Sequence, residues 1–362
     1  MQRREHLIKI FENDLFPHIG KGIIEKAYYI GLMCNKMLSC MLGRIDVDDR
    51  DSYTNKRIEM PGVLMAQRFK EFYKKMLTDC SKKFKTKMGG LSDDANPINV
   101  ITQIKTNTIE QGLNSALSTG TWGKRKGVAQ MLQRMTFLQM VSCFRRIMVL
   151  VDTANNKGIE AIRHVNSIQY GFVDAIETPE GHKVGLSKHL SLTANISINM
   201  KDQPEIIRGL IEDSGVKIER LTDIPAIQFK RLTKVFLNGD WLGMTSDSVK
   251  LADYLREKRR EGVIDKMVGI VHHFGKKEVR INTDGGRLYR PLLRVHDNQL
   301  HLTPKIISKL ETLCNWNDFL IKHPEVIDYV DIEEAENLMI CMTHYVLLTV
   351  LMTKNNKSNL AY

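Results

Sequence analysis

Apolar residues recur at helical spacing through the first part of the chain. Between Ile23 and Met41 they fall three or four positions apart, which places them on one face of a helix within residues 1–43. Residues 46–57 are polar and predict a connecting loop, and the lysines just before Gly89-Gly90 predict a flexible basic segment. The same periodicity predicts further helices over residues 63–77, 100–118 and 128–140.

From about Phe144 onward the apolar runs become shorter and turn residues more frequent. Asn238-Gly239 lies between two apolar runs, which is the usual signature of a two-residue β-hairpin. Ser246 is placed to cap a helix that stops at Gly262. Strands are predicted over residues 267–271, 278–282 and 288–295, and a further helix over residues 304–321. The pattern therefore predicts an α+β chain with a helical first part and a hairpin-rich later part.

Composition narrows the class of protein. The chain has 362 residues, of which 43% are hydrophobic and 26% charged, which is typical of a globular protein with two or three domains. It contains no run of 18 apolar residues, so no membrane span is expected, and the charged start MQRREHLIK does not resemble a secretion signal. The 6 cysteines form no CxxC pair, which predicts reduced thiols rather than disulfides or zinc.

The positive charge is unevenly distributed. The net charge is +11, with 18 basic and 11 acidic residues in positions 1–90 but 24 and 23 in positions 201–362. A polyanion such as nucleic acid is therefore expected to meet the first 200 residues. A solvated basic face without a partner would give the same excess, and charge alone does not separate the two.

Two segments have the composition of ion- or phosphate-binding loops. Asp46, Asp48, Asp49 and Asp51 are clustered, but Arg50 and Asp51 stand where a calcium loop needs an oxygen donor and a glycine, so internal ion pairs are favoured. The loop from Gly120 to Lys124 lacks the glycine spacing and the hydroxyl residue of a P-loop. It remains either an anion-binding loop ahead of a helix or a plain loop with a buried Trp122.

Two other segments carry unusually dense charge. Arg145-Arg146 and Arg163-His164 flank a polar loop and together offer four potential phosphate donors. In residues 176–192 (IETPEGHKVGLSKHLSL), glutamates interleave with Lys183 and Lys188 between two apolar runs. A solvated turn accounts for the proline and glycines there but not for the charge.

These residues, in this order, resemble the second-largest subunit of multisubunit DNA-directed RNA polymerases. The wording of the first motif is nearest that of the eukaryotic, archaeal and large-DNA-virus subunits. The matching segments are DDRDSYTNKR (48–57), ALSTGTWG (116–123), GVAQMLQRMTF (127–137), Arg145-Arg146, Tyr170-Gly171 followed by ETPEG (177–181) and GLSKHLS (185–191), VFLNGDW (235–241), LREKRREG (255–262), TDGGRLYRP (283–291) and YVDIEEAE (329–336).

The resemblance implies a multi-domain α+β fragment from the centre of that subunit. Residues 1–95 would form the second half of the protrusion, residues 96–205 a mixed α/β fork, residues 206–322 a hairpin-rich first external domain, and residues 323–362 the start of the second external domain. The N-terminal lobe and the hybrid-binding domain of the family are not matched. Residues 343–362 match no family pattern, so a split subunit, a frameshifted gene and a fragment all stay open.

The resemblance also implies roles for particular side chains. In the family the fork lies beside the melted DNA near the active centre. Glu177 would orient groups behind that centre. The side chains expected to contact nucleic acid are Arg145, Arg146, Arg163, His164, Lys183 and Lys188.

The implied chemistry belongs to the assembled enzyme. Mg²⁺ would be held by the partner largest subunit and none by this chain, which is expected to be inactive alone. Expected partners are the largest and other polymerase subunits, the DNA template and the RNA–DNA hybrid, with no membrane contact. The expected location is intracellular, in the nucleus or in a viral factory or virion. A protein-docking module and a non-functional remnant are the alternatives.

Overall fold

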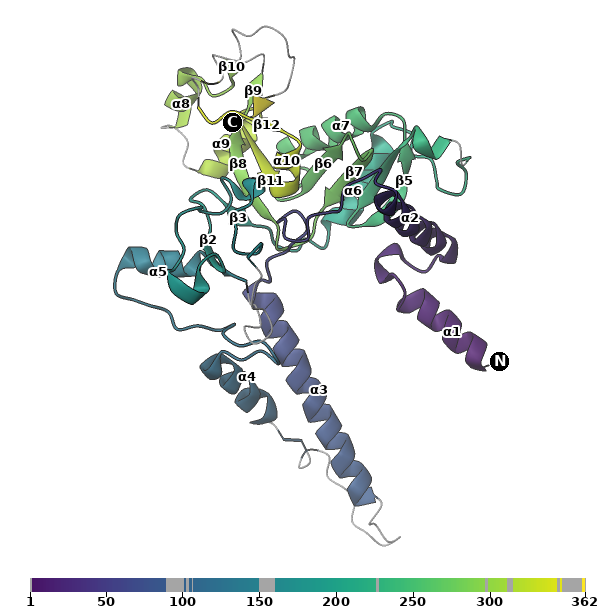
Figure 1. The fold of residues 1–362 in the computed structure, drawn as a ribbon, viewed down its shortest axis with the longest axis vertical. Helices are drawn as coiled ribbons and strands as arrows, with labels where there is room; N and C mark the ends of the chain where they lie inside the picture. Colours follow the sequence, from purple (N-terminus) through teal and green to yellow (C-terminus); the bar gives the residue numbers. More distant parts are fainter. Residues whose placement is uncertain are drawn as a thin grey trace. The chain divides into compact units, whose positions relative to one another are not determined.

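The computed structural model describes residues 2–88, 101, 104–105, 107–149, 160–225, 228–296, 299–310, 315–343, 346 and 360–361. The chain divides into two units, each formed by segments distant in sequence (Figure 1). Unit 1 comprises residues 1–57, 166–173 and 191–362, and unit 2 comprises residues 58–165 and 174–190. The domain boundary expected near residue 95 and most of the residues after 343 lie outside the described residues.

A mixed sheet of four strands forms the centre of unit 1. The order is β5-β4-β7-β6, with β4 antiparallel to β5, parallel to β7, and β7 antiparallel to β6. Asn238 (φ 51°) and Gly239 (φ 85°) join β4 to β5, and two successive residues with positive φ are what a tight hairpin requires. The strands are β4 (Thr233–Leu237), β5 (Asp240–Thr245), β6 (Gly269–His273) and β7 (Glu278–Asn282).

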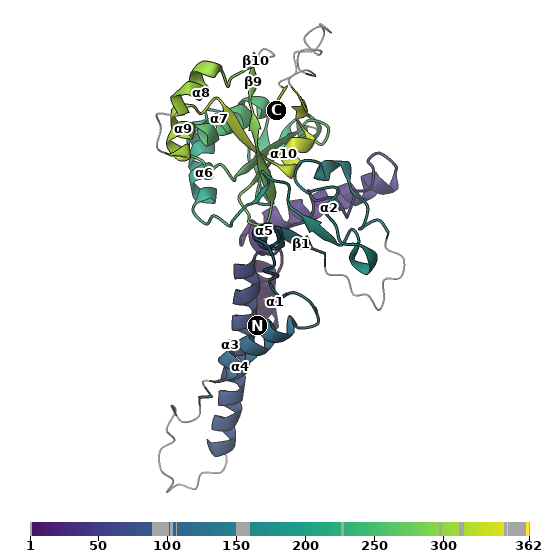
Figure 2. The ribbon, with the colours of Figure 1, turned by 90° about the vertical axis from the view of Figure 1, so that its left-hand side faces the viewer.

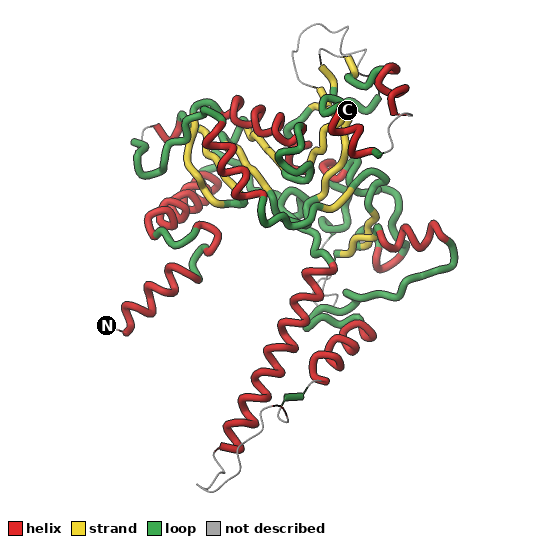
Figure 3. Tube along the Cα trace, turned by 180° about the vertical axis from the view of Figure 1, so that it is seen from behind, coloured by secondary structure: helices red, strands yellow, loops and turns green. Residues whose placement is uncertain are grey.

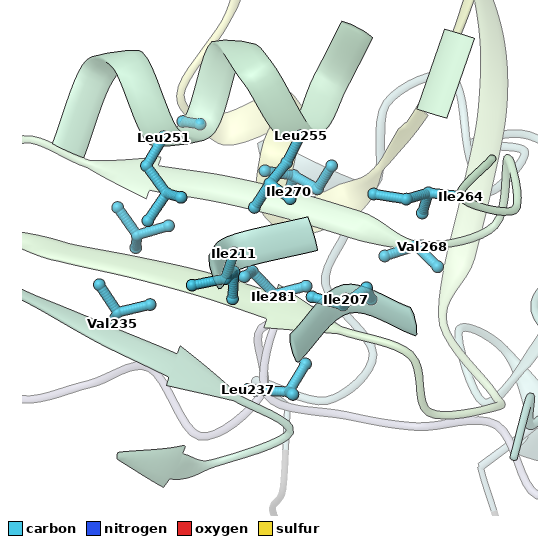
Figure 4. Close-up of a cluster of buried hydrophobic side chains, with 12 residues drawn as sticks. Ile207, Ile211, Val235, Leu237, Leu251, Leu255, Ile264, Val268, Ile270 and Ile281 are labelled. Atoms are coloured by element: carbon cyan, nitrogen blue, oxygen red, sulfur yellow. The ribbon is translucent and has the colours of Figure 1, made fainter. Parts of the chain in front are cut away.

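Successive side chains of β4 point to opposite faces of the sheet and belong to two apolar clusters. Val235 and Leu237 belong to one cluster and Phe236 to the other, so the clusters lie on opposite faces of the sheet. The first cluster joins the sheet to helices α6 (Gln203–Asp213) and α7 (Ser248–Arg260), whose Ile207, Ile211, Leu251 and Leu255 are drawn in Figure 4. Helix α2 (Ile23–Met41) meets the other face through Leu32.

Smaller elements complete unit 1. A second sheet has the order β11-β8-β3 and is antiparallel throughout. Its strands are β3 (Asn195–Ile196), β8 (Leu288–Leu293) and β11 (Ile327–Asp331). The remaining elements are α1 (Gln2–Asn13), η1 (Pro17–Ile19), η3 (Ser167–Gln169), η5 (Gln228–Lys230), β9 (Val295–His296), β10 (Gln299–Leu300), α8 (Pro304–Leu310), α9 (Trp316–Lys322), α10 (Ile332–Glu336), β12 (Met339–Ile340) and β13 (Leu360–Ala361).

Unit 2 is mostly helix and loop (Figure 3). Helices α3 and α4 run side by side (Figure 2), and a Cβ at Gly112 would lie 2.5 Å from the Phe72 ring, so glycine permits this close approach. Trp122 is buried, and its indole N–H donates to the Leu64 carbonyl at 3.1 Å. The elements are α3 (Pro61–Met88), α4 (Asn107–Thr119), α5 (Phe137–Phe144), β1 (Arg146–Met148), η4 (Gly181–Lys183) and β2 (Ser187–His189).

The local sequence signals had mixed outcomes. The α+β class, the hairpin at residues 238–239 and the strand over residues 278–282 are confirmed. The helix over residues 128–140 is wrong, because the helix begins after Thr136, whose hydroxyl accepts the Gln139 amide at 3.1 Å. The segment from Lys82 to Lys87 was expected to be flexible, yet α3 continues through it. None of the described helices has the length and apolar character of a membrane span.

Candidate nucleic-acid-binding region

Strands β1 and β2 bring the two predicted charged segments of unit 2 together. Arg146 pairs with His189 and Ile147 with Lys188 in this antiparallel ribbon. The ribbon is continued by backbone bonds, from the Leu190 amide to the Arg145 carbonyl at 3.0 Å and from the Val149 amide to the Leu186 carbonyl at 2.9 Å. The pairing joins segments about 40 residues apart in sequence, so Arg145-Arg146 and the GLSKHLS motif form one local structure.

Arg163 closes the turn ahead of β2. Its Nη1 donates to the carbonyls of His182 at 3.0 Å and Val184 at 2.7 Å. Gly185 has φ 70°, and a Cβ there would lie 2.4 Å from the Arg163 carbonyl oxygen, so this position accepts only glycine without displacement. The Thr178 hydroxyl also joins this turn to β2, accepting the Gly185 amide and donating to the Ser187 carbonyl, both at 3.0 Å.

Glu177 is held by two side chains that the sequence did not link to it. The Ser142 hydroxyl donates to Glu177 Oε1 at 2.5 Å and lies 3.0 Å from His189 Nδ1, and His189 Nδ1 lies 3.2 Å from the same carboxylate oxygen. The Ser142 hydroxyl and the Glu177 carboxylate both contact His189 Nδ1. In a serine-hydrolase triad the serine and the carboxylate contact different nitrogens of the ring, so this arrangement is not such a triad. It orients the carboxylate instead.

The six predicted nucleic-acid contacts differ in exposure. Arg146, His164 and Lys183 are exposed, and Arg145 and Arg163 are half-buried. Lys188 is only 6% exposed, and its ammonium lies 3.5 Å from the Ile162 carbonyl. All six belong to unit 2, together with Glu177.

The acidic loop of residues 46–51 forms ion pairs and polar contacts. Lys56 pairs with Asp51 at 3.1 Å, and Lys276 lies 3.4 Å from Asp48. Asp49 accepts from the Asn166 side chain at 3.0 Å. The expected ion-pair role is thus confirmed for Asp51. Across the part of the chain that the structure describes, no three potential metal ligands come together.

Comparison with known proteins covers most of the chain. Family models of RNA polymerase Rpb2 match at domain 2 (residues 1–59), domain 3 (residues 130–196), domain 4 (residues 235–296) and domain 5 (residues 316–361). The chain belongs to the family of second-largest RNA polymerase subunits. The resemblance seen in the motifs is therefore confirmed. The domain 5 match extends to residue 361, so the expectation that residues 343–362 match no pattern of the family is wrong.

Individual relatives agree with this assignment. DNA-directed RNA polymerase subunit 2 of Acanthamoeba polyphaga mimivirus is 42% identical over 94% of this chain, and subunit RPB2 of RNA polymerase II from Encephalitozoon cuniculi is 35% identical over 93%. Subunit Rpo2 of Saccharolobus solfataricus is 32% identical over 94%. The chain spans 29% to 31% of the length of these relatives.

Several motifs of the family interlock inside unit 1. Arg290 of TDGGRLYRP lies over the Phe172 ring at 4.8 Å, and a Cβ at Gly171 would lie only 1.8 Å from its guanidinium. Arg287 of the same motif pairs with Asp331 of YVDIEEAE at 2.8 Å, and both side chains are at most 3% exposed. No role was predicted for these residues, because their partners lie far apart along the chain.

A second buried cluster joins LREKRREG to YVDIEEAE. Arg259 donates to both carboxylate oxygens of Glu334, at 2.9 and 3.1 Å, and to Asp328 at 2.9 Å. Burial alone would lower the pKa of Arg259, but these carboxylates outweigh it and raise the pKa. The same balance acts on Asp328: burial favours its neutral form, but Arg259 and Arg260 lower its pKa to about 2.

Proposed function

We propose that this chain is part of the second-largest subunit of a DNA-directed RNA polymerase and contacts template or nascent nucleic acid near the active centre. The observation that carries this proposal is the β1–β2 ribbon, which groups the two charged segments in a chain related to polymerase subunits along 94% of its length. Arginine and lysine beside a polar ribbon suit a phosphate backbone, because their charge replaces condensed counterions.

The six basic side chains divide into two roles in this proposal. Arg146, His164 and Lys183 are exposed and Arg145 is half-buried, so these four would reach phosphate oxygens. Arg163 and Lys188 contact main-chain carbonyls, so they would act mainly by fixing the turn and the ribbon that present the other four. Glu177, oriented by Ser142, would lie behind the catalytic centre and hold neighbouring groups in place.

Bond formation is assigned to the assembled enzyme. Phosphodiester synthesis is an in-line displacement that two Mg²⁺ ions assist. The described residues do not fit such a metal site, because Asp48, Asp49 and Asp51 are bonded to Lys276, Asn166 and Lys56. We therefore propose that the partner largest subunit holds the Mg²⁺ and that this chain alone adds no nucleotides. Its place would be in the nucleus or in a viral factory or virion.

Salt dependence of template binding tests the proposal. In a polymerase assembled with this chain, Arg146→Ala and Lys183→Ala should each reduce the slope of log affinity against log salt by about 1, because each removes about one phosphate contact. Lys217→Ala is the matched control, since Lys217 is 85% exposed and belongs to unit 1.

The rival functions give different results in the same assay. Unchanged slopes in both variants, with normal assembly, would support a protein-docking module instead. A chain that does not assemble with the largest subunit at all would support a non-functional remnant.

A further inference from the structure

A groove of about 770 Å³ follows helix α2 in unit 1. Its wall on the α2 side runs from Ile23 to Asn35, which at 1.5 Å per residue is about 18 Å long. That length matches about three turns of a second helix. Figure 1 shows α2 lying beside β5, and the Leu32 contact with Phe236 and Trp241 fixes it to the sheet.

The floor of the groove is apolar and preformed. Tyr28 stacks on Phe229 with ring centres 6.3 Å apart, and Phe229 meets Trp241 edge-on at 6.4 Å. The rings of Tyr28, Phe229 and Trp241 pack against one another, so the most exposed apolar surface of the groove is aliphatic. Ile23 is 56% exposed and Ile24 is 59% exposed. Aliphatic surface favours protein side chains over nucleic-acid bases, which need free aromatic faces for stacking.

The rim of the groove is basic. Lys230, Lys234, Lys276 and Lys277 line it, and the residues described as its lining include no carboxylate. Lys234 lies 3.3 Å from buried Glu278, a carboxylate that it shares with Lys36 and Arg280. Lys276 lies 3.4 Å from Asp48, a carboxylate that is 77% exposed. The Lys277 ammonium donates to the Lys230 carbonyl, a neutral group that does not cancel the positive charge of Lys277.

We propose that this groove binds an acidic amphipathic helix of a partner protein. The helix would place apolar side chains at i, i+4 and i+7 spacing over Ile23, Ile24 and the aromatic floor, and acidic side chains toward the lysines. The charge of the rim selects the acidic partner, and the aliphatic floor selects a protein over a nucleic acid. The proposal concerns unit 1 alone and does not depend on nucleic-acid contact by unit 2.

Fluorescence anisotropy on the full 362-residue chain tests the proposal. The probe is a labelled peptide of about 15 residues with leucines at that helical spacing and glutamates on both flanks. The double variant Lys230→Glu/Lys276→Glu should weaken binding about tenfold or more, because it reverses two rim charges. Ile24→Glu should weaken it similarly by placing a charge on the floor.

Matched controls separate the groove from general charge effects. Val249→Glu, at a residue 49% exposed on α7, and Lys217→Glu should bind the peptide like the unmodified chain. Circular dichroism confirms that each variant is folded. Absence of peptide binding would overturn the proposal, as would equal binding of a scrambled peptide of the same composition. Tighter binding of a single-stranded oligonucleotide, lost in Lys230→Glu/Lys276→Glu, would assign the groove to nucleic acid instead.

Discussion

Two arginines of each unit contact different kinds of group. In unit 1, Arg259 and Arg287 are at most 3% exposed and are bonded to carboxylates of the YVDIEEAE segment. In unit 2, Arg163 bonds to main-chain carbonyls and Arg146 is exposed. Motifs of the same family thus serve two purposes. In unit 1 they hold the fold together, and in unit 2 they leave positive charge available for a polyanion.

The difference follows from the placement of acidic residues. Unit 1 supplies Asp328, Asp331, Glu333 and Glu334 within one short segment, so each buried guanidinium finds a carboxylate. Removing one member leaves the others charged and unpaired in a place without water, which costs several kcal/mol. An exposed arginine has no such dependence, because water solvates it before and after folding.

The largest expected effect is in the Arg259 cluster. Arg259→Met should destabilise unit 1 by about 3–5 kcal/mol, because Glu334 and Asp328 lose their shared partner while buried. Urea unfolding followed by Trp241 fluorescence, in a Trp122→Phe/Trp316→Phe background, measures this. Lys250→Met, at an exposed position of the same helix, is the control and should change stability by less than about 0.5 kcal/mol. A loss below about 1 kcal/mol for Arg259→Met would mean that the buried cluster does not stabilise unit 1.

Acid should weaken unit 1 through Glu333. Burial alone would raise the pKa of Glu333, but His273 at 3.1 Å and Arg280 at 2.8 Å lower it from 4.5 to about 2. Because the folded-state pKa lies below the unfolded one, this stabilisation is complete above about pH 5 and is lost as the pH falls toward 2, with a total on the order of 3 kcal/mol.

Urea unfolding at a series of pH values checks this pH dependence. Glu333→Gln should be less stable near neutral pH and show a flatter fall in stability between pH 5 and pH 2. Glu336→Gln, at an exposed position of α10, should keep the full slope. If Glu333→Gln keeps the slope of the unmodified chain, another carboxylate carries the effect.

In unit 2 the expected effect of Arg163 is intermediate and local. Arg163→Ala should lower the opening free energy of residues 181–190 by about 2 kcal/mol, because two charge-assisted bonds to carbonyls are lost. Hydrogen exchange read peptide by peptide measures this, with His164→Ala at the exposed neighbouring position as control. Unchanged exchange in that segment would make Arg163 a surface arginine like Arg146.

Elements defined by neighbouring residues were predicted well. The hairpin at Asn238-Gly239 and the strand at residues 278–282 follow from turn chemistry and short-range periodicity. The helix before Gly262 is observed as Ser248–Arg260, but the prediction that Ser246 caps it is wrong, because its N-cap is Asp247. The segment over residues 128–140 has apolar spacing, yet Met131 and Met135 are 94% and 85% exposed, and the helix begins only after Thr136, whose hydroxyl caps it.

The candidate site was predicted in part. The sequence indicated Arg145, Arg146 and the residue 176–192 segment, and β-pairing brings them together. It gave no signal for Ser142, because a serine 35 residues from Glu177 has no spacing that marks the contact. It also did not distinguish accessible from buried lysines, since Lys188 becomes buried only when β2 pairs with β1. The Arg259–Glu334 pair was missed because 75 residues separate its members.

The smallest expected change in stability, at Arg146, sharpens the contrast between the units most. Arg146→Ala should shift the stability of unit 2 by less than about 0.5 kcal/mol, because this guanidinium is exposed and lies 3.8 Å from Cys143 Sγ. Hydrogen exchange over residues 137–149 measures it, and Arg146→Lys, which keeps the charge, is the matched control. A loss as large as that of Arg163→Ala would mean that the arginines of both units serve the fold. If Arg146→Ala leaves the stability of unit 2 unchanged but weakens template binding, and Arg146→Lys restores binding, then Arg146 contributes to binding and not to folding.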